Sequence, residues 1–253
     1  MELIILGSGT GVPYRRRGAP GYAVLAAGKL IVLDLGAGTL RALAHHALDF
    51  SGIDLLAITH LHPDHVGDLV PFFFATHYSL GYYRVQPFIL AAARGFRDFH
   101  ERLKIPFGHW VEPPPGKMDL RELDPEGPDG LEIPGVRLRS APTRHIPGSL
   151  AYRLEADGGS LVYSGDTEFC DSLVELARGA DVLLCECAMP YSVPGHMSPE
   201  EAGRLAAQAG VKRLVLTHFY PPCDGVNVVS LAAKAFPGEI IRAEDDMRLP
   251  IPG

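Results

Sequence analysis

One run of six residues constrains this chain more than any other feature of its sequence: His60, Leu61, His62, Pro63, Asp64 and His65. The run directly follows the apolar segment Ile53–Thr59, which predicts a buried strand. Imidazole and carboxylate side chains suit zinc, manganese or iron, and the run contains no thiolate. Four potential ligands on a loop held by a buried strand therefore predict a metal site rather than a polar loop with chance histidines.

Three further candidate ligands occupy comparable positions later in the chain: His145, Asp166 and His218. Asp166 and His218 follow the apolar runs Leu161–Ser164 and Arg213–Thr217, and His145 comes a short loop after a third such run. Any one of them alone would be read as an ordinary surface or core residue. Together they place ligands at the ends of separate strands, where sites on rigid scaffolds are commonly built.

The charge of the chain disfavours a large nucleic-acid partner. Its 253 residues carry a formal net charge of −7, whereas proteins that bind structured nucleic acids usually present a basic face. The exception is the short basic cluster Arg15–Arg17, which could hold one or two phosphates of a small ligand. We therefore expect a small-molecule or short nucleotide substrate and no large structured RNA.

Neither a targeting segment nor a membrane span is expected. The apolar run Leu3–Leu6 is too short for a signal peptide, and no apolar stretch reaches the length of a membrane helix. Cys170, Cys185, Cys187 and Cys223 lack CxxC spacing and are expected to be buried free thiols, which fits a reducing compartment. We therefore expect a cytoplasmic protein.

Strands and helices alternate along the chain, which divides into two halves of similar outline, about 1–115 and 116–253. One helix has a complete capping box, in which Ser198 caps the first turn and Glu201 reaches back to it. The Pro- and Gly-rich residues 106–135 are expected to be a connection with little regular structure. The pattern indicates an α/β protein with two sheets packed face to face and helices outside.

The apolar and aromatic stretch Leu69–Tyr83 predicts a helix for which Pro71 would serve as the first residue. The stretch holds more aromatic surface than one short helix and loop can easily bury, and aromatic residues are enriched at interface cores. We therefore expect a homodimer that uses this region. The residues concerned are Leu69, Val70, Phe72, Phe73, Phe74, Tyr78, Leu80, Tyr82 and Tyr83.

These motifs resemble the metallo-β-lactamase superfamily, and within it the ribonuclease Z branch. Besides the histidine-rich run, the resemblance rests on segments spread over nearly the whole chain: Leu6–Gly11 with Pro13, Ser164–Thr167 with Cys170, Gly195–Ser198, and Thr217–Phe219. It implies an αββα sandwich of two mixed sheets with flanking helices. It also implies a single domain over residues 1–253, with metals in the cleft between the sheets.

The resemblance assigns roles to the candidate residues and implies two divalent metal ions, with zinc favoured and manganese or iron(II) compatible. One metal would take His60, His62 and His145. The other would take Asp64, His65 and His218, and Asp166 would bridge the two. The implied catalytic set is Asp64, His196 and Glu186. In this set His196 would stabilise or protonate the leaving oxygen, and Glu186 would orient His196.

The resemblance breaks down at the long arm with which ribonuclease Z enzymes grip their tRNA precursor, between the third ligand segment and the bridging aspartate. Here His145 and Asp166 are only 21 positions apart, which leaves room for little more than two strands and a turn. We therefore predict a dinuclear phosphodiesterase that acts on a small or short phosphodiester. The alternatives are a sulfate-ester, lactone or thioester hydrolase, a tRNA 3′-processing endonuclease, and an inactive scaffolding member of the superfamily.

Overall fold

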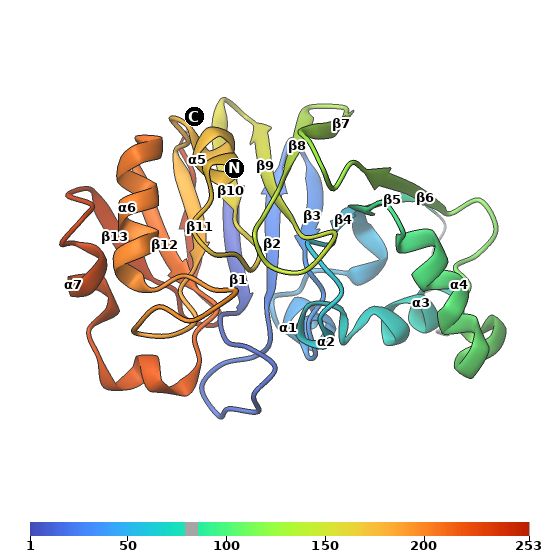
Figure 1. The fold of residues 1–253 in the computed structure, drawn as a ribbon. Helices are drawn as coiled ribbons and strands as arrows, with labels where there is room; N and C mark the ends of the chain where they lie inside the picture. The colour runs from blue at the N-terminus through green and yellow to red at the C-terminus, as the bar shows by residue number, and fades with distance from the viewer. Residues whose placement is uncertain (79–85, 253) are drawn as a thin grey trace.

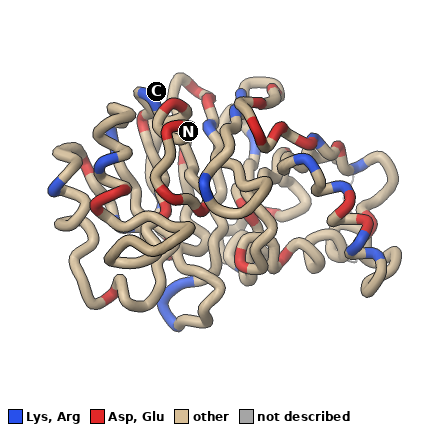
Figure 2. The backbone as a smooth tube through the Cα atoms, viewed as in Figure 1, with Lys and Arg blue, Asp and Glu red and all other residues tan. Residues whose placement is uncertain are grey.

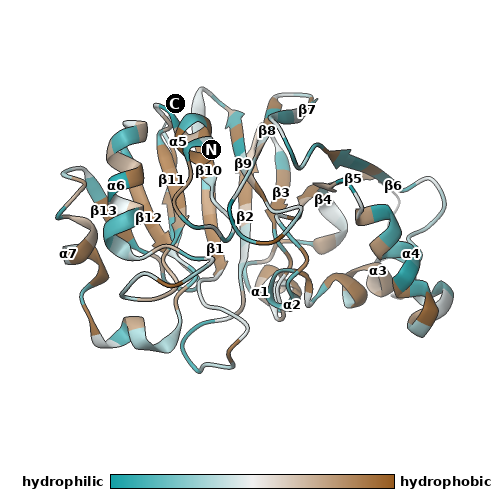
Figure 3. Ribbon diagram, viewed as in Figure 1, coloured by the Kyte–Doolittle hydropathy of each residue, from teal (hydrophilic) through white to brown (hydrophobic). Residues whose placement is uncertain are grey.

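A computed structural model describes residues 1–78 and 86–252 of the chain, and its elements form four successive layers (Figure 1). Two mixed sheets pack face to face, and helices cover the outer face of each sheet. The inner strands of both sheets are coloured mostly as hydrophobic, as expected for strands covered on both faces, whereas β6 (Met118–Leu123) and β7 (Asp129–Ile133) at the sheet edges are mostly hydrophilic (Figure 3). The predicted αββα sandwich is confirmed.

The first sheet consists, in spatial order, of β14 (Arg248–Pro250), β1 (Glu2–Gly7), β2 (Gly21–Ala26), β3 (Lys29–Leu33), β4 (Ile53–Ala57), β5 (Phe88–Ala93) and β6 (Met118–Leu123). Pairing is antiparallel from β14 to β3 and parallel from β3 to β6. Ala27 and Gly28 join β2 to β3, and their positive φ angles of 49° and 71° suit a tight two-residue hairpin turn.

The second sheet consists, in spatial order, of β13 (Glu239–Arg242), β12 (Arg213–Thr217), β11 (Val182–Glu186), β10 (Gly159–Tyr163), β9 (Leu150–Ala156), β8 (Val136–Pro142) and β7 (Asp129–Ile133). Pairing is parallel from β13 to β10 and antiparallel from β10 to β7. The hairpin of β9 and β10 turns at Asp157 and Gly158 and occupies most of the interval between His145 and Asp166. The interval therefore has the predicted content of two strands and a turn.

The two sheets repeat one topology, since each consists of four strands joined antiparallel and continued by three strands in parallel. The sheets do not divide at residue 115, because β6 and β14, both from the second half of the sequence, lie in the first sheet. The termini lie side by side, and Ile251 donates a backbone hydrogen bond to Met1 (Figure 1).

Helices on the first sheet are α1 (Thr39–His45), α2 (Pro63–Val66), α3 (Leu69–Tyr78) and α4 (Phe96–Phe107). Those on the second sheet are α5 (Asp171–Ala177), α6 (Pro199–Ala209) and α7 (Val228–Ala232). Three short 3₁₀ helices are η1 (Phe50–Gly52), η2 (Gly108–Val111) and η3 (Pro221–Gly225). The predicted capping box is present at the start of α6, where Ser198 and Glu201 bond to one another's backbone N–H.

The core has three parts, one between the sheets and one under each helical layer. Between the sheets, the rings of Tyr22 and Tyr163 lie 4.8 Å apart among buried aliphatic side chains. Cys170, Cys185, Cys187 and Cys223 are all buried and free, as predicted. No helix among the described residues is both long enough and apolar enough to cross a bilayer.

The structure corrects the interpretation of residues 106–135, which contain η2 and the strands β6 and β7. Pro134 and Gly135 form the turn between β7 and β8, and Gly135 takes a φ of 80° there. Helix α3 begins at Leu69, two residues before Pro71. Of the predicted interface residues, Leu80, Tyr82 and Tyr83 lie outside the described part of the chain.

Candidate metal centre

The predicted ligands converge at one edge of the sandwich because each follows a strand. Strand β4 ends just before His60, and α2 begins at Pro63, which places Asp64 and His65 in its first turn. Likewise Asp166 comes after β10 and His218 directly after β12. Gly36 allows the chain to pass closely behind this loop, since a Cβ there would lie 2.2 Å from the Asp64 carbonyl oxygen.

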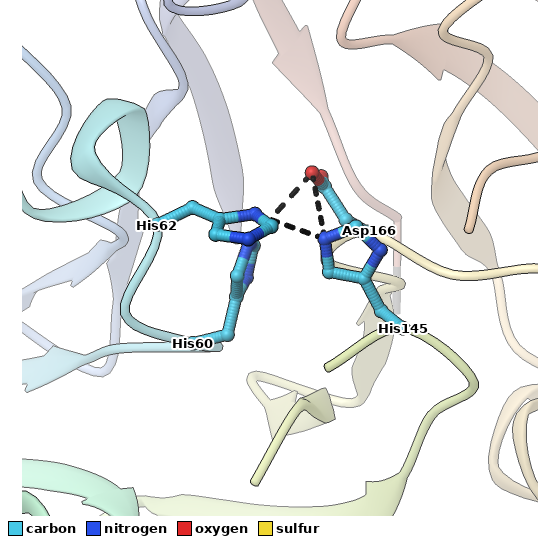
Figure 4. Close-up of side chains that lie close together, drawn as sticks. All are labelled: His60, His62, His145 and Asp166. Atoms are coloured by element: carbon cyan, nitrogen blue, oxygen red, sulfur yellow. Dashed lines mark hydrogen bonds and ion pairs between the residues drawn. The ribbon is translucent and has the colours of Figure 1, made fainter. Parts of the chain in front are cut away.

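A first group of side chains consists of His60, His62, His145 and Asp166, with one ligand atom from each lying within 4.8 Å of the others (Figure 4). Nε2 of His145 is 3.0 Å from Nδ1 of His62 and 3.8 Å from Oδ2 of Asp166. Nε2 of His60 is 3.7 Å from the same Asp166 oxygen. The four side chains therefore point at a common centre.

A second group consists of Asp64, His65 and His218, again with ligand atoms within 4.8 Å of one another. Asp166 lies between the two groups. Its Oδ1 is 3.2 Å from Nε2 of His65, and its Oδ2 is 3.2 Å from Nε2 of His218. The structure thus brings all seven predicted ligands together, with Asp166 close to histidines of both groups.

Several inward-facing polar atoms of these groups have no hydrogen-bond partner despite being fully buried. They include Nε2 of His60, His65 and His218, and Oδ1 of Asp166, which approach only within this cluster, as ion pairs at 3.2–4.0 Å. A buried polar atom without a partner costs on the order of 1–3 kcal/mol, so a native protein rarely leaves several side by side. Nitrogen and oxygen donors that converge in this way fit divalent cations such as zinc, manganese or iron.

Hydrogen bonds behind the imidazoles leave two inner nitrogens free to donate an electron pair. Nδ1 of His145 donates to the carbonyl oxygen of Gly195 at 2.8 Å. Thr59 gives its only hydroxyl proton to Asp34, so its Oγ1 must accept from Nδ1 of His60 at 3.0 Å. Nε2 of both imidazoles then carries the lone pair, as a metal ligand requires.

Burial and mutual charge set the protonation of the centre. Burial holds the pKa of His60 far below its usual range, and His65 lowers it further; burial also lowers the pKa of His145. Burial opposes protonation of His65, but Asp166 and Asp34 outweigh it and raise that pKa. Burial would raise the pKa of Asp166, but His218 and His65 lower it. At neutral pH, His60 and His145 are therefore neutral and Asp166 is ionised, which are the forms that bind cations, whereas Asp166 and Asp34 favour the protonated form of His65.

Asp34 organises the centre from behind, and no prediction included it. Its Oδ2 accepts hydrogen bonds from His65 Nδ1 and Tyr163 Oη, both at 2.7 Å, and Oδ1 accepts from the backbone of Thr59. Asp34 is fully buried and has a φ of 57°, and His218 has a φ of 60°. Such backbone is uncommon for residues other than glycine and is kept only where the surrounding structure holds it in place.

His196 stands beside both groups with Glu186 behind it. Nδ1 of His196 donates to Oε1 of Glu186 at 2.9 Å, and its ring lies 5.0 Å from that of His145 and 5.7 Å from that of His218. Burial lowers the pKa of His196, but the hydrogen bond to Glu186 outweighs this effect and the pKa is raised. This imidazole can therefore carry a proton next to the centre.

Tyr220 is a second residue near the centre that the sequence did not predict. It follows the last ligand, His218, by two positions. Its ring lies 6.4 Å from that of His196 and 6.3 Å from that of His218. Its half-buried hydroxyl group has a raised pKa because of burial and the nearby Asp64. The spacing alone gave no signal, since a tyrosine after a strand is ordinary core or surface.

Of the basic cluster Arg15–Arg17, only the first two side chains are exposed. Arg17 is buried: it donates to Ser8 Oγ at 2.8 Å and to the Ala243 carbonyl oxygen at 2.9 Å, and its guanidinium lies 4.8 Å from the centre of the Phe219 ring. The prediction that Arg17 helps to hold a phosphate is therefore wrong, because its donors serve the fold.

Comparison with known proteins identifies relatives of the whole chain. A family model described as a beta-lactamase superfamily domain matches residues 31–219. An uncharacterised protein of Mycobacterium leprae is 38% identical over 220 residues, covering 83% of this chain and 74% of that protein. A ribonuclease Z of Mycobacterium bovis is 30% identical over 282 aligned positions, covering 99% of this chain and 98% of that protein.

Solved structures share the fold over nearly the full length. The metallo-beta-lactamase fold protein YhfI of Bacillus subtilis superposes with a TM-score of 0.83 at 22% identity, covering 98% of each chain. The short form of human tRNase Z superposes with a TM-score of 0.77 at 25% identity, covering all of both chains. The fold, the matched domain and these relatives agree with the resemblance seen in the sequence, and the chain belongs to the metallo-β-lactamase superfamily.

Proposed function

We propose that this protein is a metal-dependent phosphodiesterase that acts on a small or short phosphodiester at a dinuclear centre. One observation carries the proposal: two groups of inward-facing ligand atoms share Asp166, and the His196–Glu186 pair stands beside them. In this proposal His60, His62 and His145 hold one divalent ion, and Asp64, His65 and His218 hold the other. Zinc is the favoured metal because the donors would be imidazole nitrogens and carboxylate oxygens.

A pair of divalent ions would polarise the phosphoryl group and lower the pKa of water, so that a nucleophile is present at neutral pH. The residues of the chain supply the rest. Asp64, whose Oδ2 accepts a hydrogen bond from the backbone of Gly11 at 3.0 Å, is held at the mouth of the site. His196 donates its proton toward the leaving oxygen, and Glu186 fixes the ring orientation and favours the charged form.

The size of the substrate follows from what surrounds the site. Residues 150–163 form a plain two-stranded hairpin where the resemblance would place an arm for tRNA. Basic and acidic residues are interspersed along the chain, apart from one basic stretch on the loop between β1 and β2 (Figure 2). Affinity for structured RNA depends mainly on many Lys and Arg contacts to phosphates, so a small diester suits this protein better.

tRNA 3′-end processing is the second candidate, and the match to a mycobacterial ribonuclease Z over nearly the whole of both chains favours it. A substrate panel separates the two. Protein reconstituted with zinc or manganese should cleave bis(4-nitrophenyl) phosphate and a cyclic or short nucleotide, and should process precursor tRNA slowly or not at all. Efficient cleavage of precursor tRNA at low micromolar concentration would restore the ribonuclease assignment.

The same panel should include an aryl sulfate, a lactone and a thioester. Activity on any of these substrates, with none on phosphodiesters, would indicate a hydrolase of that substrate class instead. A protein that binds its metals but hydrolyses nothing in the panel would favour a scaffolding role.

We also propose a cytoplasmic location, because all four cysteines are free and buried.

A further inference from the structure

A cavity of about 190 Å³ lies next to the first ligand group and has no role in the chemistry described above. Three segments line it: residues 58–61, residues 92–96 and residues 146–148. Pockets that enclose a whole drug-sized ligand usually measure ~300–1,000 Å³. This cavity is therefore large enough for one part of a small substrate and too small for two nucleotides.

The walls of the cavity are mainly apolar. Ile58, Ala92 and Phe96 are almost completely buried, and Leu61 and Ile146 close the sides. The hydroxyl group of Thr59 is already used by Asp34 and His60. Among the lining residues, the fully charged side chain is that of Arg94, which is mostly exposed and lies 3.0 Å from a carboxylate oxygen of Asp124. The cavity thus combines apolar surfaces with one guanidinium at its rim.

The position of the cavity relates it to the reacting groups. His60 lines the cavity and belongs to the first ligand group, and Ile146, which also lines it, directly follows His145. The His145 ring lies 4.9 Å from the His60 ring and 5.0 Å from the His196 ring. His145 therefore neighbours both a residue that lines the cavity and the proposed proton donor. A diester at the centre, with its leaving oxygen toward His196, would have this cavity nearby for its other substituent.

We propose that this cavity binds the substituent that stays on phosphorus, and that the substituent is a single nucleobase with its sugar. The inference rests on the proposed phosphodiesterase function. A base is flat, has two apolar faces and fits one compact cavity. The guanidinium plane of Arg94 can stack on such a face, as arginine does in many proteins that bind single bases.

Two substrates with one leaving group test the inference. Thymidine 5′-(4-nitrophenyl phosphate) and methyl 4-nitrophenyl phosphate both react with water to release 4-nitrophenol. They leave thymidine 5′-monophosphate and methyl phosphate, respectively. A difference between their kcat/KM values therefore reports on the retained substituent and not on the leaving group. Wild-type protein should prefer the thymidine ester.

Substitution of Ala93, the last residue of β5, by leucine should fill the cavity from its wall. Ala93→Leu should lower kcat/KM for the thymidine ester by roughly 5- to 150-fold, the range that loss of base stacking corresponds to, and change kcat/KM for the methyl ester by less than about twofold. The matched control is Ala233→Leu on the exposed C-terminal end of α7, which should alter neither value.

Arg94→Ala provides a second variant in case Ala93→Leu disturbs folding, because the Arg94 side chain is mostly exposed. Arg94→Ala should also lower kcat/KM for the thymidine ester selectively. Calorimetric titration adds a readout without turnover: each variant should weaken binding of thymidine 5′-monophosphate and leave binding of inorganic phosphate unchanged.

Several results would overturn the inference. Equal losses on both esters, no loss on either, or a wild-type preference for hexyl 4-nitrophenyl phosphate over the thymidine ester would each do so. If wild-type protein cleaves no phosphodiester at all, the proposed function fails instead. The nucleotide titration then still decides whether the cavity binds a base.

Discussion

His196 is the residue whose substitution best separates proton donation from metal binding. It contacts Glu186 at 2.9 Å and lies outside the two ligand groups described above, although it also forms a third set of close ligand atoms with Asp166 and His218. His196→Ala should lower kcat by ~10²–10⁴-fold on esters with poor leaving groups, which need a proton. Esters of 4-nitrophenol should lose much less, since nitrophenolate leaves without one.

Steady-state rates on an alkyl and a nitrophenyl diester, with the metal content of the same samples, check this prediction. Glu186→Gln is the matched variant, because it keeps the side-chain volume and removes the charge that favours the protonated ring. It should show the same pattern to a smaller degree. Equal losses on both esters would assign His196 a binding or structural role.

Asp34 gives a prediction of a different kind, since it touches the ligands and not the substrate. Asp34→Asn replaces the charged acceptor that fixes His65 with a neutral amide, and such outer partners typically affect metal affinity by ~10–100-fold. Competition with a coloured chelator measures that affinity. Tyr163→Phe is the control, because it removes one of the two other hydrogen bonds to the same oxygen and leaves His65 held. A similar loss in both variants would mean that general destabilisation causes the effect.

The contrast between Asp34 and the His60–His65 run shows what the sequence can reveal about a site. Several ligands within six residues form a local pattern that is visible without any structure. Asp34 is a single acid after an ordinary strand, and its importance comes from contacts with residues 25 to 129 positions away. Long-range partners of this kind leave no spacing to detect.

At the scale of elements, Asp181 ties together the starting ends of three strands in the second sheet. Its Oδ2 accepts from the backbone and hydroxyl of Ser160 in β10, both at 2.7 Å, and its Oδ1 lies 2.6 Å from Nζ of Lys212 before β12. Burial alone would raise the pKa of Asp181, but Lys212 and Ser160 outweigh it and lower that pKa. The carboxylate therefore stabilises the starting ends of these neighbouring strands.

Asp181→Asn should reduce the free energy of unfolding by about 1.5–3 kcal/mol at neutral pH, the usual contribution of hydrogen bonds to a charged group. Since the folded-state pKa is the lower one, the stabilisation is complete above about pH 4, the unfolded value, and is lost as pH falls through the folded value. Urea unfolding of the wild-type protein and of Asp181→Asn across this pH range measures the difference in stability.

Glu239→Gln, which breaks the exposed ion pair with Arg213 at the start of β13, is the control and should cost about 1 kcal/mol or less. A loss in Asp181→Asn that equals the control, or that does not shrink in acid, would contradict the role given to Asp181.

Elements with a strong local pattern could be predicted, and those defined by their partners could not. The capping box of α6 and the buried strands β4, β11 and β12 were visible in the sequence. Strand β6 is half exposed at a sheet edge, and its existence depends on pairing with β5. The β7–β8 hairpin could not be predicted locally, because Pro134 and Gly135 suit an irregular connection as well as a turn between strands.

At the scale of the whole molecule, we still propose a homodimer, but the surface that would form its interface differs from the one predicted from the sequence. Phe72 and Phe73 are buried inside the chain, whereas Phe74 and Trp110 are about half exposed, with ring centres 5.8 Å apart. Ile105 on α4 is 83% exposed. An exposed apolar group of this kind is typical of an interface core.

We predict that the protein is a dimer at micromolar concentration and that Ile105→Glu shifts it toward monomer, because the variant places a charge on the apolar surface. Light scattering measures the mass. Val226→Glu is the control: Val226 is an exposed apolar residue next to η3 and should leave the mass unchanged. A wild-type monomer, or an Ile105→Glu variant that stays fully dimeric, would contradict this interface.

The central claim is the dinuclear centre with Asp166 between its two ligand groups, and elemental analysis tests it most directly. Protein reconstituted with zinc and freed of excess metal should hold about two equivalents per chain, and Asp166→Ala should lose most of them while remaining folded. Fewer than one equivalent in the wild-type protein, or an Asp166→Ala variant that binds metal as well as wild type, would contradict the claim.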